Sequence, residues 1–355
     1  VIRRFYPDGD KFILIFASVL AVVGVATLYR INRVTAIKQL VWIALGIISY
    51  ILIVVILPDL RSFAKYKKIY MIVTLVLMPL ALIFGTEQYG AKNWIIIGKV
   101  ISFQPSEFGK IALVLYLASA LATYEDKKNF KEDFKELWQP ALVAGFSMGC
   151  MVLQRDLGSA LIFFGISITL LYVATSKKKY VFTALGLAAV GSVAGYSMFG
   201  HVRERVMIWL DPWKYKLGES YQIIEGMYSI AAGGLFGVGL GQGHFQNLPV
   251  KESDMIYAII CEEFGIIFAI GLMIIYFLLF YRGIRAAFVT DDKYSQLIAV
   301  GFSTMIACQT LVIIGGIFAV IPLTGITLPI ISYGGSSVLT IFFALGILQK
   351  ISEEA

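Results

Sequence analysis

Long apolar blocks, almost free of charged residues, alternate with short polar segments along most of this 355-residue chain. Hydrophobic residues make up 59% of the sequence and charged residues only 15%, whereas roughly a quarter of the residues in a soluble domain are charged. A block of about 18 or more apolar residues is long enough to cross a bilayer as a helix. The pattern therefore predicts an all-α polytopic membrane protein.

The apolar blocks predict about ten transmembrane helices. They run from Lys11 to Leu28, Leu40 to Leu57, Ile69 to Phe84, Phe108 to Ala122, Ala141 to Leu153, Leu157 to Ala174, Val181 to Phe199, Phe264 to Tyr281, Leu297 to Leu323, and Val338 to Leu348. The fifth and sixth blocks can also be interpreted as one segment, interrupted and bent at Arg155 and Asp156. We expect residues 1–355 to form a single membrane domain.

A long polar, aromatic and glycine-rich stretch, about residues 200–262, separates the seventh and eighth blocks. Unstructured connections of this length are uncommon in compact folds, so we expect an ordered segment outside the bundle. The glycines between Gly233 and Gly243 have a spacing similar to that of a dinucleotide-binding loop. No βαβ pattern surrounds them, which excludes that site and favours tight turns and close packing.

The distribution of basic residues predicts the orientation of the chain. More than half of the 30 lysine and arginine residues fall in the segments that share a side with the N-terminus. Because such residues concentrate in cytoplasmic loops, we expect both termini and Lys177 to Lys179 to be cytoplasmic. The stretch 200–262 and Trp94 are then extracytoplasmic. The distribution of the basic residues in the cytoplasmic loops accounts for the net charge of +7. Because no basic stripe lies on a soluble domain, we expect no nucleic-acid partner.

Several ionisable residues fall at membrane depth or at its surface, where they are costly unless they face a cavity or a partner. The residues are Glu107 with Lys110, Arg155 with Asp156, Glu262 with Glu263, and Asp254. Glu107 and Lys110 are three residues apart and so share a helix face. A purely structural alternative exists for each group, namely an ion pair that holds helix ends together.

A set of motifs in a fixed order carries a family resemblance. They are Asn93-Trp94-Ile95, Phe103 to Glu107 with Lys110, Asp156-Leu157-Gly158, Tyr221-Gln222, Gly233 to Gly237, Leu248-Pro249 with Ser253-Asp254, Glu262 to Gly265, and Pro322 to Gly325 followed by Leu328-Pro329 through Ser337. Together they resemble the SEDS proteins, the shape, elongation, division and sporulation family that includes RodA and FtsW. The resemblance extends from the first expected span to the last.

The resemblance implies a ten-span fold and a peptidoglycan glycosyltransferase that polymerises lipid II at the outer face of the bacterial cytoplasmic membrane. It implies a class B penicillin-binding protein, a transpeptidase, as partner, in elongation, division or sporulation. Asp254 matches the family's essential aspartate. Trp94, Glu107, Lys110 and Asp156 match positions that line its central cavity.

This sequence departs from the family pattern beside those motifs. Val250 and Glu252 stand where glutamate and histidine are common, and Lys92-Asn93 replaces an arginine-rich pair. Arg155 and Ile313 replace a common proline and a common asparagine. The departures near Asp254 leave open whether a second acidic residue takes part.

The proposed reaction needs a base, cations for a departing diphosphate, and room for lipid tails. Asp254 suits the base, with Lys251 and Glu252 expected to shift its pKa in opposite directions. The candidate diphosphate ligands are Lys92, Lys110, Arg203 and Arg205. The hydroxyls of Ser336 and Ser337 suit a phosphate oxygen, or alternatively satisfy backbone groups at membrane depth. Arg203 and Arg205 have an alternative role as interfacial anchors.

No cofactor is certain from the sequence. Three cysteines and two histidines have no metal-ligand spacing, and no dense acidic cluster forms a metal cage. A divalent cation, Mg²⁺ or Mn²⁺, can still bridge the substrate diphosphate to one carboxylate. Two other functions remain open: a lipid II flippase, and a non-catalytic scaffold for a penicillin-binding protein.

Overall fold

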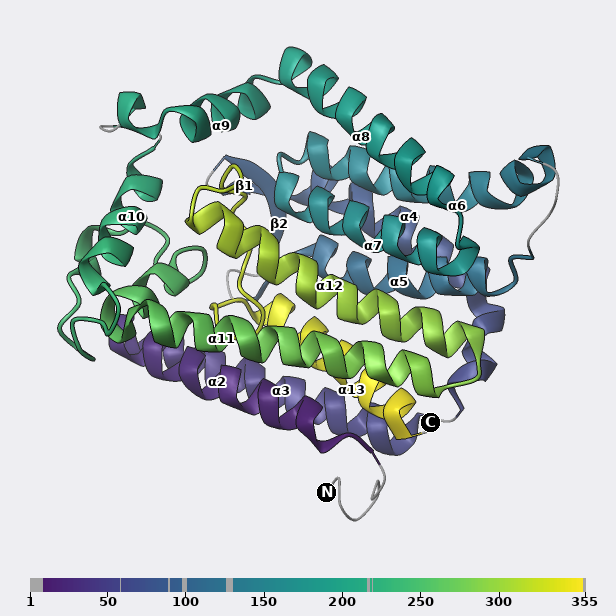
Figure 1. Ribbon diagram of the computed structural model, residues 1–355, viewed down its shortest axis with the longest axis horizontal. Helices are drawn as coiled ribbons and strands as arrows, with labels where there is room; N and C mark the ends of the chain where they lie inside the picture. Colours follow the sequence, from purple (N-terminus) through teal and green to yellow (C-terminus); the bar gives the residue numbers. More distant parts are fainter. Residues whose placement is uncertain are drawn as a thin grey trace.

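The computed structural model describes residues 9–57, 59–88, 90–97, 101–125, 130–215, 218 and 220–353 as a bundle of long helices (Figure 1). The long helices are α2 (Lys11–Ile31), α3 (Arg33–Ile56), α4 (Lys67–Phe84), α5 (Pro105–Ala122), α6 (Phe130–Leu153), α7 (Leu157–Thr175), α8 (Lys178–Met198), α11 (Ile256–Val289), α12 (Lys293–Ile317) and α13 (Gly335–Glu353). A 3₁₀ segment, η1 (Leu60–Tyr66), precedes α4.

Nine helices of the described chain are long and apolar enough to cross a membrane. The fifth expected span corresponds to α6, which falls outside that set and begins at Phe130 rather than at Ala141, with Glu132 and Asp133 in its first turn. The alternative of one bent segment is wrong. Helix α6 ends at Leu153, and Arg155 turns the chain with a φ of 62° so that α7 packs beside α6.

The eighth span begins earlier than predicted. Helix α11 starts at Ile256, so that Glu262 and Glu263 lie inside it, and Gly265 interrupts it with φ 82° and ψ 167°. Only glycine adopts this backbone conformation readily. The chain near Gly237 packs against Gly265 so closely that a Cβ there would lie 2.4 Å from the Gly237 nitrogen. The apolar pattern identified the segment after this break and missed the part before it.

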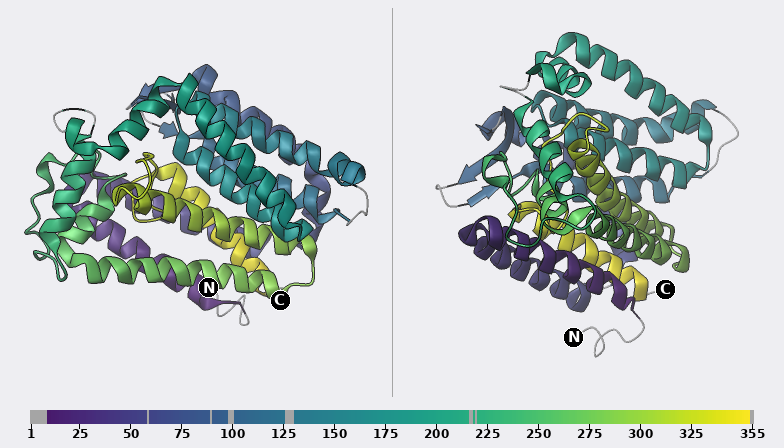
Figure 2. Two further views of the ribbon diagram at one scale, coloured as in Figure 1. Left: turned by 45° about the horizontal axis from the view of Figure 1, so that its top comes forward. Right: turned by 60° about the vertical axis from the view of Figure 1, so that its left-hand side comes forward.

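Helices α5 and α12 form the centre of the bundle, since most of their residues are buried. Helices α2 and α3 lie together along one side, and α8 lies on the opposite side (Figure 2). Helix α8 packs on α7 and α9 and has no buried residue. Its apolar surface therefore faces outward along its whole length, as expected of a helix in contact with lipid.

The expected extracytoplasmic segment is largely helical. It contains α9 (Gly200–Leu210), the 3₁₀ turn η2 (Pro212–Tyr215), α10 (Tyr221–Gly233) and the 3₁₀ turn η3 (Phe245–Asn247). A small antiparallel sheet, which the all-α prediction lacked, adjoins it at the same end of the bundle (Figure 1). Its strands are β1 (Thr86–Gln88), β2 (Ala91–Ile97) and β3 (Ile101–Phe103).

The two ends of the chain meet at the opposite end of the bundle (Figure 1). The Asp10 amide donates to the Ser352 hydroxyl at 3.2 Å, and Arg282 pairs with Asp10 at 3.3 Å. Lys177 pairs with the buried Asp133 at this end as well. Both ends of the described chain therefore lie on one side, as the topology requires. Arg3, Arg4, Lys127 and Lys128, which also favoured this orientation, lie outside the described residues.

Candidate functional site

Asp254 lies in a tight turn immediately before α11. The Val250 carbonyl accepts hydrogen bonds from the amides of Ser253, Asp254 and Met255 at 3.3, 3.1 and 3.4 Å. Val250 has a φ of 48°, a conformation that is strained for a β-branched residue. The turn holds the Asp254 carboxylate half-buried at the base of the segment that connects α8 to α11.

A second segment, residues 318–334 between α12 and α13, packs against this turn. The Tyr333 amide donates to the Glu252 carbonyl at 2.9 Å, and the Ser332 hydroxyl donates to the Ser253 carbonyl at 2.5 Å. Gly325 lies so close that a Cβ there would be 3.4 Å from Asp254 Oδ2. The 318–334 segment therefore forms one wall of the site around Asp254.

Arg205 approaches the same wall from α9. Its guanidinium donates to the carbonyls of Leu323 and Thr324 at 3.1 and 3.2 Å. Arg203 points elsewhere, since it donates to the carbonyls of Tyr196 and Ser197 and is exposed. Of the two predicted arginines, the structure brings only Arg205 to the site, and Arg203 fits the alternative role of an interfacial anchor.

The pKa of Asp254 is raised from 3.8 to about 6. Burial is the main cause, because it disfavours the charged form, and the hydrogen bond from Ser253 and the charge of Arg205 partly oppose it. The charge of Asp156 raises the value further. The expected pair of neighbours acts elsewhere: Lys251 donates to the Gln246 carbonyl, and Glu252 accepts from Thr35 at 3.0 Å. Burial therefore brings the pKa of Asp254 closer to neutral pH than that of an exposed aspartate.

Asp156 is the N-cap of α7, and its carboxylate is almost completely buried. It accepts hydrogen bonds from the Ser159 amide and hydroxyl at 3.0 and 2.8 Å. Asn93 of β2 donates to it at 3.1 Å, and Gln104, just before α5, donates at 2.9 Å. Through these four hydrogen bonds Asp156 connects α7, the sheet and the start of α5. From this position its negative charge raises the pKa of Asp254.

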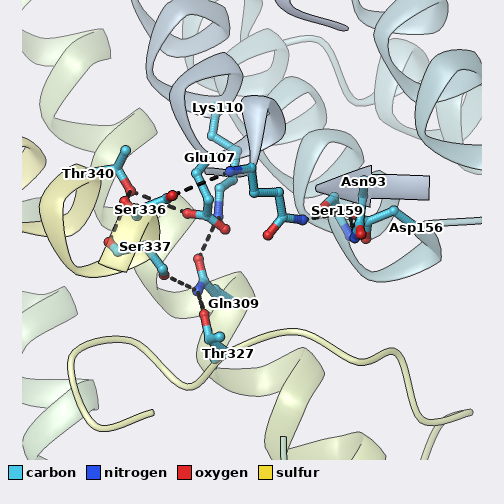
Figure 3. Close-up of polar contacts among 11 residues, drawn as sticks. Asn93, Glu107, Lys110, Asp156, Ser159, Gln309, Thr327, Ser336, Ser337 and Thr340 are labelled. Carbon is cyan, nitrogen blue, oxygen red and sulfur yellow. Dashed lines mark hydrogen bonds and ion pairs between the residues drawn. The ribbon is translucent and has the colours of Figure 1, made fainter. Parts of the chain in front are cut away.

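Glu107 and Lys110 form a buried ion pair on α5 with a distance of 2.9 Å between Oε1 and Nζ. The Thr340 hydroxyl donates to Glu107 Oε2 at 3.2 Å, and Lys110 donates to Gln309 Oε1 at 2.8 Å. Figure 3 shows Gln309 and Thr340 on either side of the pair. The pair was expected to face the cavity, but the structure buries both side chains between α5, α12 and α13.

Gln309 connects this pair to the wall of the Asp254 site. Its side-chain amide donates to the Thr327 carbonyl at 2.9 Å and to the Ser337 hydroxyl at 3.2 Å (Figure 3). Thr327 belongs to the 318–334 segment, which also contacts Asp254. A chain of hydrogen bonds thus runs from Lys110 through Gln309 to that wall. Sequence reasoning missed Gln309, although an amide inside an apolar block is a usable signal.

The remaining predicted ligands are engaged with the protein. Ser336 accepts from the Gln104 amide at 3.3 Å, and Ser337 accepts from Gln309, so both hydroxyls tie α13 to its neighbours. Lys92 donates to the Leu82 carbonyl at 2.7 Å. Trp94 lies in β2, half-buried and paired with Thr86. None of these contacts brings the four side chains to Asp254.

Glu262 and Glu263 hold the glycine-rich segment before η3 rather than the candidate site. Glu262 accepts from the His244 amide at 2.6 Å. Glu263 accepts from the Gly241 and Gly243 amides and pairs with Arg30 at 3.3 Å. The ion pair of Glu263 matches the structural alternative foreseen for this group, whereas Glu262 accepts a backbone hydrogen bond instead. Within the described part of the chain, no group of three or more His, Cys, Asp or Glu residues is placed to hold a metal.

Comparison with known proteins gives a consistent family. The model of the FtsW, RodA and SpoVE family, described as cell cycle protein, matches residues 11–355. The peptidoglycan glycosyltransferase RodA of Mycobacterium tuberculosis is 35% identical, over all of this chain and 80% of its own length. Stage V sporulation protein E of Bacillus subtilis is 34% identical, over 97% of this chain and 96% of its own.

A solved structure supports the same conclusion. It is described as showing the structural coordination of polymerization and crosslinking by a peptidoglycan synthase complex. Its matching chain has a TM-score of 0.81 and 27% identity, over 97% of both chains. The resemblance inferred from the motifs is therefore confirmed, and the chain belongs to the FtsW, RodA and SpoVE family of multi-pass membrane proteins.

Proposed function

We propose that this protein is a peptidoglycan glycosyltransferase that joins lipid II units into glycan strands. The observation that carries the proposal is the half-buried Asp254 carboxylate, held against the 318–334 segment, to which Arg205 also bonds, at the end of the bundle away from the termini. The names of the relatives and the family membership support the reaction class. A carboxylate with a pKa of about 6 is suited to accept a proton at neutral pH.

The chemistry follows from the substrates of such a reaction. The 4-hydroxyl of an acceptor N-acetylglucosamine attacks the anomeric carbon of a lipid-linked N-acetylmuramic acid. A new glycosidic C–O bond forms, the bond from that carbon to the diphosphate breaks, and the diphosphate leaves with its electron pair. Asp254 takes the hydroxyl proton as the bond forms. Arg205 is bonded to the same wall and its charge acts on Asp254, so it would supply a cation that stabilises charge on the leaving diphosphate.

The other predicted substrate ligands have partners in the protein. Lys92 and Lys110 donate to protein oxygens, and Ser336 and Ser337 accept from protein donors. We assign Lys110 the role of positioning the wall through Gln309. A divalent cation that bridges the diphosphate would find its protein ligand in Asp254, because Asp156 already accepts four hydrogen bonds.

The proposed location is the bacterial cytoplasmic membrane, with both termini in the cytoplasm and Asp254 outside. Cysteine substitutions at Lys178 and at Gln246, both solvent-accessible positions at opposite ends of the bundle, test this orientation in cells lacking other reactive cysteines. We expect an impermeant thiol reagent to label position 246 and to spare position 178. Labelling of position 178 from outside would reverse the orientation.

The proposed partner is a class B penicillin-binding protein, by analogy with the synthase complex whose chain this fold matches. Polymerisation and crosslinking are consecutive reactions on the same strand, so the two activities benefit from a shared complex. The helical extracytoplasmic segment is the proposed contact region.

The pH dependence of polymerisation tests the assignment of the base. Because Asp254 acts as a carboxylate with a pKa of about 6, we expect the rate to rise through pH 6 and level off above pH 7. At one pH unit below the pKa, about a tenth of the carboxylate is ionised, so the rate should fall about tenfold. The measurement is the initial rate of glycan formation from lipid II by purified protein.

The Arg205→Gln variant provides the matched comparison. Removing the positive charge that lowers the pKa of Asp254 should move the midpoint of the profile to higher pH. A midpoint that stays in place in this variant, or a flat profile in the unmodified protein, contradicts the assignment.

A further inference from the structure

A pocket of about 300 Å³ lies where α2 ends and α3 begins, apart from the groups used in the reaction. Its lining residues are Ala26, Tyr29, Arg30, Arg33 and Leu240. It lies at the Asp254 end of the bundle, because Thr35, two residues after Arg33, donates to Glu252. Two guanidinium groups therefore share a pocket with apolar walls.

Arg30 is held in a fixed position by three contacts. Its guanidinium donates to the Gly241 carbonyl at 2.7 Å and pairs with Glu263 at 3.3 Å. It also lies 5.1 Å from the centre of the Phe245 ring. About a third of its side chain stays exposed. Because these partners fix the guanidinium before any ligand arrives, binding costs little side-chain entropy.

Arg33 has its charge available for a ligand. Its guanidinium lies over the Tyr29 ring at 5.3 Å, and no carboxylate of a described residue lies within ion-pair distance of it. The side chain is exposed. The stacking on Tyr29 orients the planar guanidinium without neutralising it, and this arrangement suits recognition of a phosphate.

The surroundings of the pocket are apolar and face outward. Val22, Tyr29 and Val34 of α2 and α3 are exposed by 69%, 53% and 62%. On the other side Leu240 is 63% exposed and Phe236 is 80% exposed, although Glu262 and Glu263 hold their loop in place. Since these helices cross the membrane, such side chains face lipid tails. Two arginines at the edge of this surface lie at headgroup level.

We propose that this pocket binds the phosphate of a lipid in the leaflet at the Asp254 end of the protein. Arg33 and the exposed part of Arg30 contact the phosphate oxygens, and the tails lie along the exposed residues of α2 and α3. A guanidinium binds phosphate through paired charge-assisted hydrogen bonds, which a headgroup without an anionic group cannot provide. The site is tested by binding alone, so its failure is distinguishable from failure of the proposed reaction.

Two lipids carry this chemistry, and the experiment separates them. Native mass spectrometry of the purified full-length protein is used to compare binding of undecaprenyl diphosphate and of phosphatidylglycerol. The test variant is Arg33→Gln, which removes an exposed positive charge from the pocket. Its control is Lys38→Gln, which removes an exposed positive charge from the same helix outside the pocket. We expect Arg33→Gln to weaken binding about tenfold, the loss of a strong charge-assisted contact, and Lys38→Gln to change it little.

The outcomes separate the two sources. Weakening for undecaprenyl diphosphate alone identifies a lipid-linked diphosphate as the occupant, and weakening for phosphatidylglycerol, alone or as well, identifies a bilayer phospholipid. A Leu240→Asp variant, which adds a negative charge to the pocket wall and leaves both arginines intact, should give the same loss. Equal binding of both lipids by Arg33→Gln and Lys38→Gln, with Leu240→Asp unchanged, overturns the proposal.

Discussion

Replacing Lys110 by methionine should lower the free energy of unfolding by about 3–5 kcal/mol, the cost of leaving one partner of a buried ion pair alone. Lys110 and Glu107 are 1% and 5% exposed. Without Lys110, the Thr340 hydroxyl is the one side-chain donor that the described residues still provide to the Glu107 carboxylate, and Gln309 loses the donor to its oxygen. The measurement is thermal unfolding in detergent at fixed pH, followed by intrinsic fluorescence.

Two further variants identify the cause of that loss. Combining Glu107→Gln with Lys110→Met removes both charges and should recover most of the lost stability. Arg61→Met breaks the exposed pair with Asp59, whose side chains are 55% and 60% exposed, and should cost under about 1 kcal/mol. If Lys110→Met unfolds at the same temperature as the double variant, the buried charge is not the cause.

The same variants show whether the network positions the Asp254 wall. Lys110 holds Gln309, which in turn holds Thr327 in the 318–334 segment. We expect the folded fraction of Lys110→Met to polymerise lipid II more slowly per molecule than the unmodified protein. Activity that falls only in proportion to the folded protein would make the pair purely structural.

The apolar blocks predicted the membrane bundle well, because helix length and hydropathy are set locally. The errors in this prediction, the start of α11 and the missing sheet, come from contacts between residues that are distant in sequence. The segment before Gly265 is helical because the break is filled by the glycine-rich loop, whose Gly234 carbonyl accepts from the Ile266 amide. The small sheet β1 to β3 was missed because it depends on pairing between strands, and strands as short as β1 and β3 have too few residues to show an alternating pattern.

The candidate site was predictable in its residue types but not in its connections. The sequence named Asp254 and Asp156 as candidates, but it predicted that Lys251 and Glu252 would shift the pKa of Asp254. In the structure burial, Ser253, Arg205 and Asp156 determine that pKa. Proximity along the chain is a poor guide here, because Lys251 and Glu252 bond to other partners. Arg205 of α9 and Asp156 at the start of α7 act on the carboxylate from distant parts of the sequence.

Replacing Asp254 by asparagine should abolish detectable glycan polymerisation. The expected fall in rate is about 10²–10⁴-fold, the range for removing a general base. Asparagine keeps the shape and polarity of the side chain but cannot accept the hydroxyl proton. It also leaves the hydrogen bonds from Ser332 and Tyr333 intact, since those go to backbone carbonyls. Expression and thermal stability should therefore stay close to those of the unmodified protein.

Two comparisons make the Asp254 result specific. Asp254→Glu keeps the carboxylate but displaces it by about one ångström, and a displacement of this size can cost about 10²-fold. Glu252→Gln removes the neighbouring acid, which accepts from Thr35 on the side of α3. Polymerisation by Glu252→Gln within a few fold of the unmodified rate excludes a second acidic residue at this turn.

Gel analysis of the products made from lipid II by the purified protein and its Asp254→Asn variant tests the central claim most directly. Each is assayed with the partner transpeptidase present and its own active site inactivated. We expect a ladder of glycan strands from the unmodified protein and unreacted lipid II from the variant. Glycan of normal length from the Asp254→Asn protein would contradict the mechanism.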